Sequence, residues 1–200
     1  MSSPLKKRLK DAFRATTLLR TRDLTALGIN RNQMRDALQT GLVEQAGRGL
    51  YRMPKSDVTE HHSLAEIAKQ VPNGVICLLS ALSFHGLTTQ GPHEVWLAID
   101  HKAWSPRSAN LRLRVVRFSG AALNEGIEIH PVEGVPLRVY SPAKTVADCF
   151  KFRNKIGIDV AIEALRETWR ERRATMKDLE RYARIGRVSK IMQPYLESLT

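Results

Sequence analysis

Side chains that can read nucleic-acid bases recur within one short stretch of the chain, residues 30–40. In the major groove of DNA, arginine pairs with the edge of guanine, and asparagine or glutamine pairs with that of adenine. Five residues of these types fall on one face of the stretch: Arg31, Asn32, Gln33, Arg35 and Gln39. Between them, Met34, Ala37 and Leu38 have the spacing of a helix that packs one face on a core. The stretch is therefore predicted to be a helix, capped by Asn30, whose outer face forms hydrogen bonds.

The neighbouring elements predict a winged helix-turn-helix around that helix. A short helix is expected over residues 21–27, with Thr21 as its cap, and Gly28 suits the left-handed turn that follows. A hairpin is expected over residues 42–52, with Arg48 at its tip. This order of elements is typical of a domain that places its second helix in the major groove of duplex DNA. The predicted DNA-facing set is completed by Thr21, Arg22, Arg48, Tyr51 and Arg52.

The charge of the chain favours a polyanionic partner. The 200 residues carry a formal net charge of +12, and residues 1–55 hold twelve Lys and Arg against four Asp and Glu. A basic surface can serve solubility alone, but its concentration on the predicted helix-turn-helix favours DNA. The basic residues of a first helix, expected over residues 2–13, either contact phosphates or only solvate its surface. They are Lys6, Lys7, Arg8 and Lys10.

A second, larger domain is expected after a polar boundary at residues 54–60. Its predicted helices cover 57–69, the nearly all-apolar run 75–87, 159–173 and 189–198, with two more starting at Ser141 and Thr175. Its predicted strands cover 94–100, 111–115, 126–130 and 135–140, with a turn over 131–134. The fold class is therefore predicted to be α+β. A winged helix-turn-helix is expected over residues 1–55, and a mixed domain with a small sheet and several helices over 60–200.

Four segments also carry a family resemblance: GLVEQAGRGLYRMP, LLSALSFHGL, VWLAID and YSPAKTVADCFKFRNKIG. Together they make nearly the whole chain closely resemble the AbiEi antitoxins of type IV toxin–antitoxin systems. The resemblance implies a transcriptional autorepressor whose winged helix binds inverted repeats in its own promoter. It also implies that the C-terminal domain contributes to repression and counteracts a nucleotidyltransferase-like toxin, typically without a stable complex. By position it implies a DNA-facing set of Arg31, Asn32, Arg35, Arg48 and Arg52. No active-site residue is carried over from the family to the C-terminal domain.

One pattern leaves an enzymatic alternative open. Glu94 and Asp100 fall on one face of a predicted strand, and Lys102 follows two residues later, as in the ending of one metal-dependent nuclease pattern. Such a site would hold Mg²⁺ and activate water behind a winged-helix targeting domain. A three-residue pattern is common by chance, and no acid in a second element is evident. The preferred interpretation is a non-enzymatic protein with no metal or cofactor.

The other reactive residues show no catalytic pattern. The histidines lack the spacing of metal ligands, and His85 is expected to pack at a helix end. Cys77 and Cys149 are expected to be reduced and to lie in apolar helical surroundings. Lys144 and Asp148, one helical turn apart, form either an exposed ion pair or a partner-facing site.

One further expectation concerns basic residues of the second domain. A group of arginines either forms the solvated face of a sheet, which is the preferred interpretation, or adds a nucleic-acid contact. The group comprises Arg112, Arg114, Arg117 and Arg138.

No apolar run is long enough to span a membrane, and the chain starts without a signal-peptide core, so a cytoplasmic protein is expected.

Overall fold

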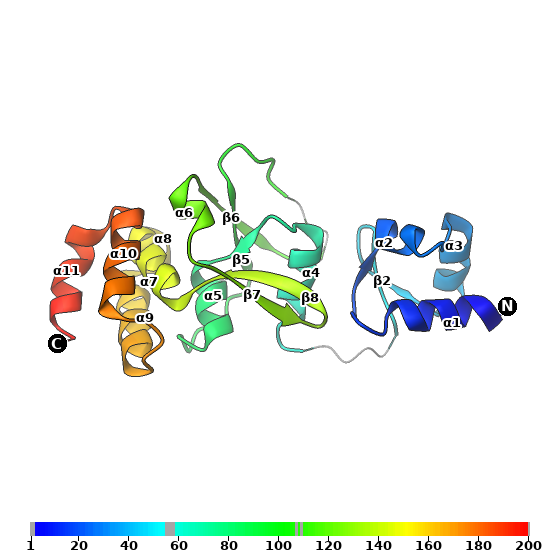
Figure 1. Ribbon diagram of the computed structural model, residues 1–200, viewed down its shortest axis with the longest axis horizontal. Helices are drawn as coiled ribbons and strands as arrows, with labels where there is room; N and C mark the ends of the chain where they lie inside the picture. Colours follow the sequence, from blue (N-terminus) through cyan, green and yellow to red (C-terminus); the bar gives the residue numbers. More distant parts are fainter. Residues whose placement is uncertain (1–2, 55–58, 107, 109, 200) are drawn as a thin grey trace. The chain divides into compact units, whose positions relative to one another are not determined.

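The chain is a mixed α+β protein with two sheets, as predicted (Figure 1). The computed structural model describes residues 3–54, 59–106, 108 and 110–199. The chain divides into two compact units. The N-terminal unit comprises residues 1–73, 106–111 and 130–137, and the C-terminal unit comprises residues 74–105, 112–129 and 138–200. Among the described helices, none combines the length and apolarity that crossing a bilayer requires.

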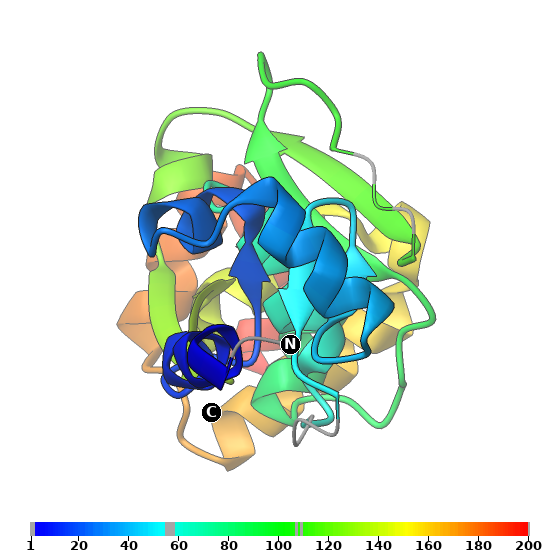
Figure 2. The ribbon, with the colours of Figure 1, turned by 90° about the vertical axis from the view of Figure 1, so that its right-hand side faces the viewer.

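The N-terminal unit has the element order of a winged helix. It contains α1 (Ser3–Ala12), β1 (Leu19–Arg20), α2 (Thr21–Ala26), α3 (Arg31–Gln39), β2 (Glu44–Gly47), β3 (Leu50–Arg52) and α4 (His62–Gln70). The strands form an antiparallel sheet in the order β1-β3-β2. Figure 2 shows α1 to α3 in blue and the β2–β3 hairpin in cyan. The hairpin is the wing, and α3 is the second helix of the helix-turn-helix.

Local sequence explains where α2 and α3 begin. Gly28 has a φ of +73°, in the left-handed turn between the two helices. Asn30 caps α3, as predicted. Thr21 does not cap α2, contrary to the prediction, because Arg20 is the N-cap residue and its backbone N–H donates to Asp23 Oδ2 at 3.0 Å. The acidic third residue of the helix thus bonds the N-cap backbone, and Thr21 is the first residue of the helix.

A small apolar core holds α3 in place. Leu9 of α1, Leu24 of α2, and Met34 and Ala37 of α3 are buried in one cluster. Burying a side chain the size of leucine or methionine stabilises a fold by roughly 1.5–3 kcal/mol. The inward face predicted for α3 is confirmed, so its polar residues are held on the outside by packing.

The helix predicted over residues 57–69 begins later, at His62 of α4. Residues 57 and 58 lie outside the described residues. Thr59 Oγ1 accepts from the backbone N–H of His61 at 3.2 Å, and Thr59 O accepts from that of His62 at 3.0 Å. A threonine side chain that bonds the backbone two residues on favours a turn, which explains the later start.

The C-terminal unit is built around a five-stranded sheet in the order β6-β5-β4-β8-β7. Its strands are β4 (Val75–Ile76), β5 (Val95–Asp100), β6 (Leu113–Phe118), β7 (Ile127–Val132) and β8 (Val135–Tyr140). Its helices are α5 (Leu78–His85), α6 (Ala121–Asn124), α7 (Pro142–Lys151), α8 (Arg153–Ile156), α9 (Ile158–Arg170), α10 (Met176–Gly186) and α11 (Ser189–Glu197). The tip of the β7–β8 hairpin, within residues 130–137, belongs to the N-terminal unit.

The apolar run 75–87 is not one helix, and that prediction was wrong. Val75 and Ile76 form β4, which pairs antiparallel with β5 and parallel with β8, and Cys77 is the N-cap residue of α5. An apolar run that is buried on all sides gives no periodicity to separate strand from helix. The strand predicted over 111–115 lies at Leu113–Phe118, and the turn of the β7–β8 hairpin follows Val132 rather than His130.

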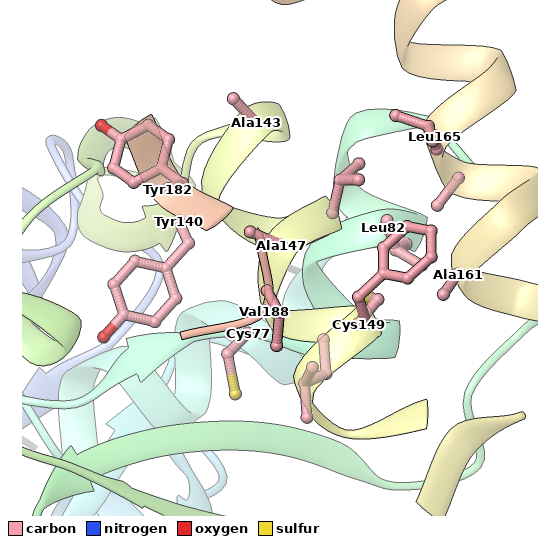
Figure 3. Packing of buried hydrophobic residues seen from close by; sticks show 14 of the residues in the cluster. Cys77, Leu82, Tyr140, Ala143, Ala147, Cys149, Ala161, Leu165, Tyr182 and Val188 are labelled. Carbon is pink, nitrogen blue, oxygen red and sulfur yellow. The ribbon is translucent and has the colours of Figure 1, made fainter. Parts of the chain in front are cut away.

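Helices α5, α7, α9, α10 and α11 contribute to one apolar core, part of which Figure 3 shows. Cys77 and Cys149 are free thiols buried in this core, and burial raises the pKa of both well above the ordinary value of a thiol. A thiol that stays protonated is a poor nucleophile. The expectation of unreactive packing cysteines is met, although Cys77 joins a strand to a helix instead of lying within a helix.

Candidate nucleic-acid interface

The outer face of α3 carries most of the predicted base-reading residues. Arg31, Asn32, Arg35 and Gln39 are exposed, whereas Met34 on the opposite face is buried. Arg31, Asn32 and Arg35 border a surface concavity of about 790 Å³ between α2, α3 and β3. It is lined by Thr21, Thr25, Ile29, Arg31, Asn32, Met34, Arg35, Leu38 and Tyr51. Guanidinium, amide and hydroxyl groups therefore surround one hollow beside the wing.

Gln33 is the exception on this face, because its side chain is half-buried and already bonded. Its Oε1 accepts from the backbone N–H of Asn30 at 2.9 Å, and Asn30 Oδ1 accepts from the backbone N–H of Gln33 at 2.9 Å. This reciprocal pair is a capping box, which satisfies two of the free N–H groups at the start of α3. Gln33 thus helps to hold the helix that presents the other residues.

Helix α2 is joined to the wing at its first residue. The backbone N–H of Thr21 donates to Gly49 O at 3.0 Å, and its Oγ1 lies 3.4 Å from the same oxygen. Gly49 has a φ of +66°, a conformation that suits glycine, and it follows the exposed Arg48 at the tip of the wing. Arg22 is exposed on α2. The structure therefore brings Thr21 to the wing and leaves Arg48 open to solvent.

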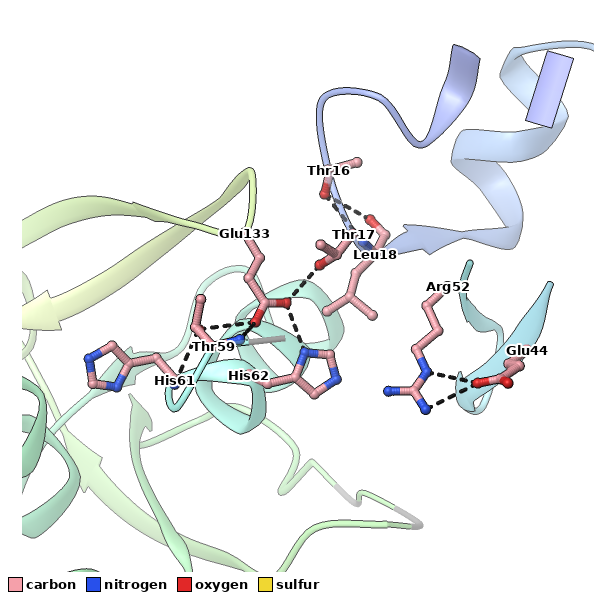
Figure 4. A network of polar contacts seen from close by, with 9 residues as sticks. All are labelled: Thr16, Thr17, Leu18, Glu44, Arg52, Thr59, His61, His62 and Glu133. Atoms are coloured by element: carbon pink, nitrogen blue, oxygen red, sulfur yellow. Dashed lines mark hydrogen bonds and ion pairs between the residues drawn. The ribbon is translucent and has the colours of Figure 1, made fainter. Parts of the chain in front are cut away.

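Arg52 is engaged within the hairpin, which sequence reasoning did not anticipate. Its guanidinium lies 3.1 Å from Glu44 Oε2 across the β2–β3 ladder (Figure 4). Both side chains are partly exposed, and pairs of this kind contribute about 0–1 kcal/mol to stability. The pair lowers the local positive charge that the prediction assigned to Arg52. Tyr51, on the neighbouring position, lines the concavity instead.

Residues outside the predicted set position α2. Asp23 lies 3.0 Å from Lys69 of α4, in addition to its bond with the Arg20 amide. Burial alone would raise the pKa of Asp23, but these hydrogen bonds outweigh it and lower the pKa. Arg8 of α1 donates to Leu27 O at 2.7 Å, at the end of α2. The position of Asp23 at the third residue of a helix could have indicated its capping role, whereas Lys69 and Arg8 are tertiary partners with no sequence signal.

Glu133 organises a second set of polar contacts in the N-terminal unit (Figure 4). It accepts from Thr17 Oγ1 at 2.7 Å and from the Thr59 backbone N–H at 2.8 Å, and it lies 2.8 Å from His62 Nδ1. Burial alone would raise its pKa, but these hydrogen bonds lower it. Glu133 therefore links the segment after α1, the start of α4 and the tip of the β7–β8 hairpin.

In the part of the chain that the structure describes, the residues of the nuclease alternative do not form a metal site. Glu94 pairs with Arg114 at 3.0 Å. Asp100 Oδ1 accepts from the backbone N–H of Lys102 at 2.8 Å, which forms a turn after β5. Within the described part of the chain, no group of three or more His, Cys, Asp or Glu residues could hold a metal ion.

Lys144 and Asp148 are buried, so the exposed ion pair was a wrong alternative. Both side chains are 1% exposed, and the Lys144 ammonium pairs with Asp148 Oδ2. The ammonium also lies over the rings of Phe118 at 4.7 Å and Tyr140 at 4.3 Å. Burial raises the pKa of Asp148 to about 6, and Lys144 opposes that rise. His85 is also buried and bonds Tyr140 O at 2.8 Å, which fits the expected packing role.

The group of arginines at positions 112, 114, 117 and 138 combines structural contacts with solvated side chains. Arg114 lies over the ring of Trp96 at 5.0 Å, and Arg117 bonds the loop after β5. Arg112, just before β6, is exposed, and Arg138 is half-buried in β8. Arg114 and Arg117 thus have partners in the C-terminal unit.

The comparison with family models decides the class of the N-terminal segment. Residues 7–54 match the model described as "Transcriptional regulator, AbiEi antitoxin". Over these residues the chain is similar to the AbiEi antitoxin regulators. The AbiEi match spans α1 to the wing, and therefore every predicted DNA-facing residue. The other three segments that carry the resemblance lie outside the matched range.

A solved structure resembles most of the chain. The crystal structure of the RV2827C protein from Mycobacterium tuberculosis has a TM-score of 0.62 and 15% sequence identity. The similarity covers 91% of this chain and 72% of that one. At this identity the similarity shows a shared fold and nothing about function. No curated protein matches the chain in sequence.

Proposed function

We propose that this protein is a sequence-specific DNA-binding antitoxin that represses its own toxin–antitoxin operon. In this proposal it binds inverted repeats in the promoter as duplex DNA and acts by occupying that site rather than by breaking a bond. The observation that carries the proposal is the outer face of α3, where Arg31, Asn32 and Arg35 are exposed beside the concavity next to the wing. Gln39 is exposed on the same helix. The AbiEi match over residues 7–54 supports the same assignment.

The side chains divide by the group each can reach on DNA. Arg35 and Asn32, one turn apart on the exposed face, pair with guanine and adenine edges. Arg31, at the first position of α3, and Arg48, at the wing tip, contact the phosphate backbone or the adjacent groove. Thr21 and Tyr51, at the margin of the concavity, supply hydroxyl groups for phosphates.

The proposal includes two copies of the chain on each operator. A single winged helix offers a small interface, and useful specificity for one site in a genome requires more base contacts. Inverted repeats supply them when two domains bind half-sites spaced by about one helical turn, roughly 10–10.5 base pairs, or a multiple of it. Residues 1–55 would read each half-site.

The role of residues 60–200 follows from the family resemblance. We infer that this region contributes to repression and counteracts a nucleotidyltransferase-like toxin encoded beside it, without a stable complex between the two proteins. The five-stranded sheet and its helices provide a folded region of ample size for such a role. Expression of the neighbouring reading frame with and without this chain tests it, since rescued growth is the expected result.

Titration of the gene's own upstream region by fluorescence anisotropy tests the DNA-binding proposal. Arg35→Ala should weaken binding by about 5- to 150-fold, which corresponds to roughly 1–3 kcal/mol for a base contact. Arg184→Ala is the matched control, because Arg184 is also exposed but lies on α10. Equal affinities of the two variants for this DNA would contradict the proposed role of α3.

A further inference from the structure

The side chain of Trp104 is almost fully exposed to solvent. Its exposed fraction is 96%, whereas Trp96 on the preceding strand is 4% exposed. Within the described residues, the other exposed large hydrophobic side chains are Leu27, Ile129 and Ile158. A tryptophan can bury roughly 150–250 Å² of surface, so its exposure forgoes a large gain. Such a residue calls for a partner that covers it.

The loop that carries Trp104 is fixed by the protein itself. Arg117 of β6 donates to three backbone oxygens, those of Asp100 at 3.3 Å, His101 at 3.0 Å and Ala103 at 2.7 Å. It also donates to Ser105 Oγ at 3.0 Å. These bonds enclose the tryptophan position on both sides. Since these bonds hold residues 100–105 before a partner arrives, binding there costs little backbone entropy.

The surroundings of the indole are basic rather than apolar. Lys102, two residues earlier, is exposed, and the one nearby carboxylate, that of Asp100, already accepts from the backbone N–H of Lys102 at 2.8 Å. No other Asp or Glu occurs in the sequence from there to Phe118. The core of a protein–protein interface groups several apolar side chains, but Ile129 and Ile158 belong to β7 and α9. A single aromatic ring among cations is instead the arrangement that stacks on a base while neutralising phosphate.

We propose that this loop binds unpaired nucleic acid, with the Trp104 indole stacked on a nucleobase and Lys102 beside the phosphates. Bases in an intact duplex are covered by their neighbours, so the indole has access only where a strand is single. Stacking needs no particular base, so the contact tolerates many sequences. It is separate from the α3 face and does not depend on promoter recognition.

Fluorescence anisotropy of the full chain with a labelled 12-nucleotide oligo(dT) and with oligo(U) of equal length tests this proposal. Base stacking contributes about 1–3 kcal/mol, so Trp104→Ala should weaken single-strand binding by about 5- to 150-fold. Trp104→Phe should retain most of the affinity, since a phenyl ring also stacks. Lys102→Ala should flatten the dependence of log affinity on log salt by about 0.7. A preference for one oligomer identifies DNA or RNA as the source of the strand.

Two controls separate this site from the rest of the protein. Ile129→Ala removes an exposed hydrophobic side chain from β7 and should leave single-strand binding unchanged. Arg35→Ala should weaken promoter binding while single-strand binding persists, so either activity can fail alone. Unchanged single-strand affinity in Trp104→Ala would overturn the proposal. So would a loss confined to duplex DNA.

Discussion

Asn30 and Gln33 cap each other's backbone at the start of α3, through two hydrogen bonds of 2.9 Å. The first turn of the helix that is proposed to enter DNA is therefore fixed from within the protein. Arg31 and Asn32 lie between the two capping residues, on the exposed side. Their presentation depends on a bond between two neighbours that need not touch DNA.

Replacing the cap should loosen that first turn. Asn30→Ala is expected to lower the free energy of unfolding by about 0.5–2 kcal/mol, because the backbone N–H of Gln33 loses its acceptor. Urea unfolding followed by circular dichroism measures the change. Gln39→Ala, at the exposed far end of α3, is the matched control and should change stability by less than about 0.5 kcal/mol. Equal effects of the two substitutions would contradict a capping role.

The Glu133 contacts should make stability sensitive to acid. Hydrogen bonds lower the folded-state pKa of this carboxyl group, so its contribution is present above the ordinary value of 4.5 and is lost as pH falls through the folded pKa. Glu133→Gln should therefore be less stable than the parent at pH 7, and the difference should shrink as the pH is lowered below 4.5. Urea unfolding at several pH values measures this. A constant difference would show that the carboxylate charge is unimportant.

The buried Lys144–Asp148 pair should tolerate the loss of both charges better than the loss of one. Lys144→Met leaves an uncompensated buried carboxylate and is expected to cost about 3–5 kcal/mol. Lys144→Met combined with Asp148→Leu should recover part of that loss. Arg170→Ala, which removes an exposed partner of Glu167, should cost less than about 1 kcal/mol. Thermal unfolding of these variants measures their losses of stability. Equal losses in the single and the double variant would refute the prediction.

The adjacent lysines of α1 should raise the affinity for any DNA duplex without changing which sequence is preferred. Lys6 and Lys7 are exposed, and each phosphate contact contributes about 0.9 to the slope of log affinity against log salt. Replacing both by alanine should lower affinity for promoter and scrambled duplexes alike and flatten the slope by about 1.8. Titrations at several salt concentrations measure it. An unchanged slope would show that α1 does not touch phosphate.

Local signals allowed much of the N-terminal fold to be predicted. Gly28, Asn30 and the spacing of Met34 and Ala37 act within a few residues, so the turn, the cap and the buried face of α3 could be inferred from the sequence. The extra strand β4 was missed because its pairing partners, β5 and β8, are distant in sequence, and an apolar run by itself does not reveal them.

The sequence predicted which residue types form the candidate site. It did not predict which of these side chains bond to other residues of the protein. The exposure of Arg31, Asn32 and Arg35 follows from helical periodicity. That Gln33 is bonded to its cap, and that Arg52 is paired with Glu44, depends on rotamers and on cross-strand register. The burial of Lys144 was missed for a related reason, since a Lys–Asp pair one turn apart is usually solvated.

Footprinting of the promoter tests the central claim most directly, namely that the exposed face of α3 selects a DNA sequence. Wild-type protein should protect two inverted half-sites, and the double variant Arg31→Ala/Arg35→Ala should lose this pattern while it keeps weak, unselective binding. Arg184→Ala should leave the footprint unchanged. Protection without sequence preference, or an identical footprint from the double variant, would contradict the account.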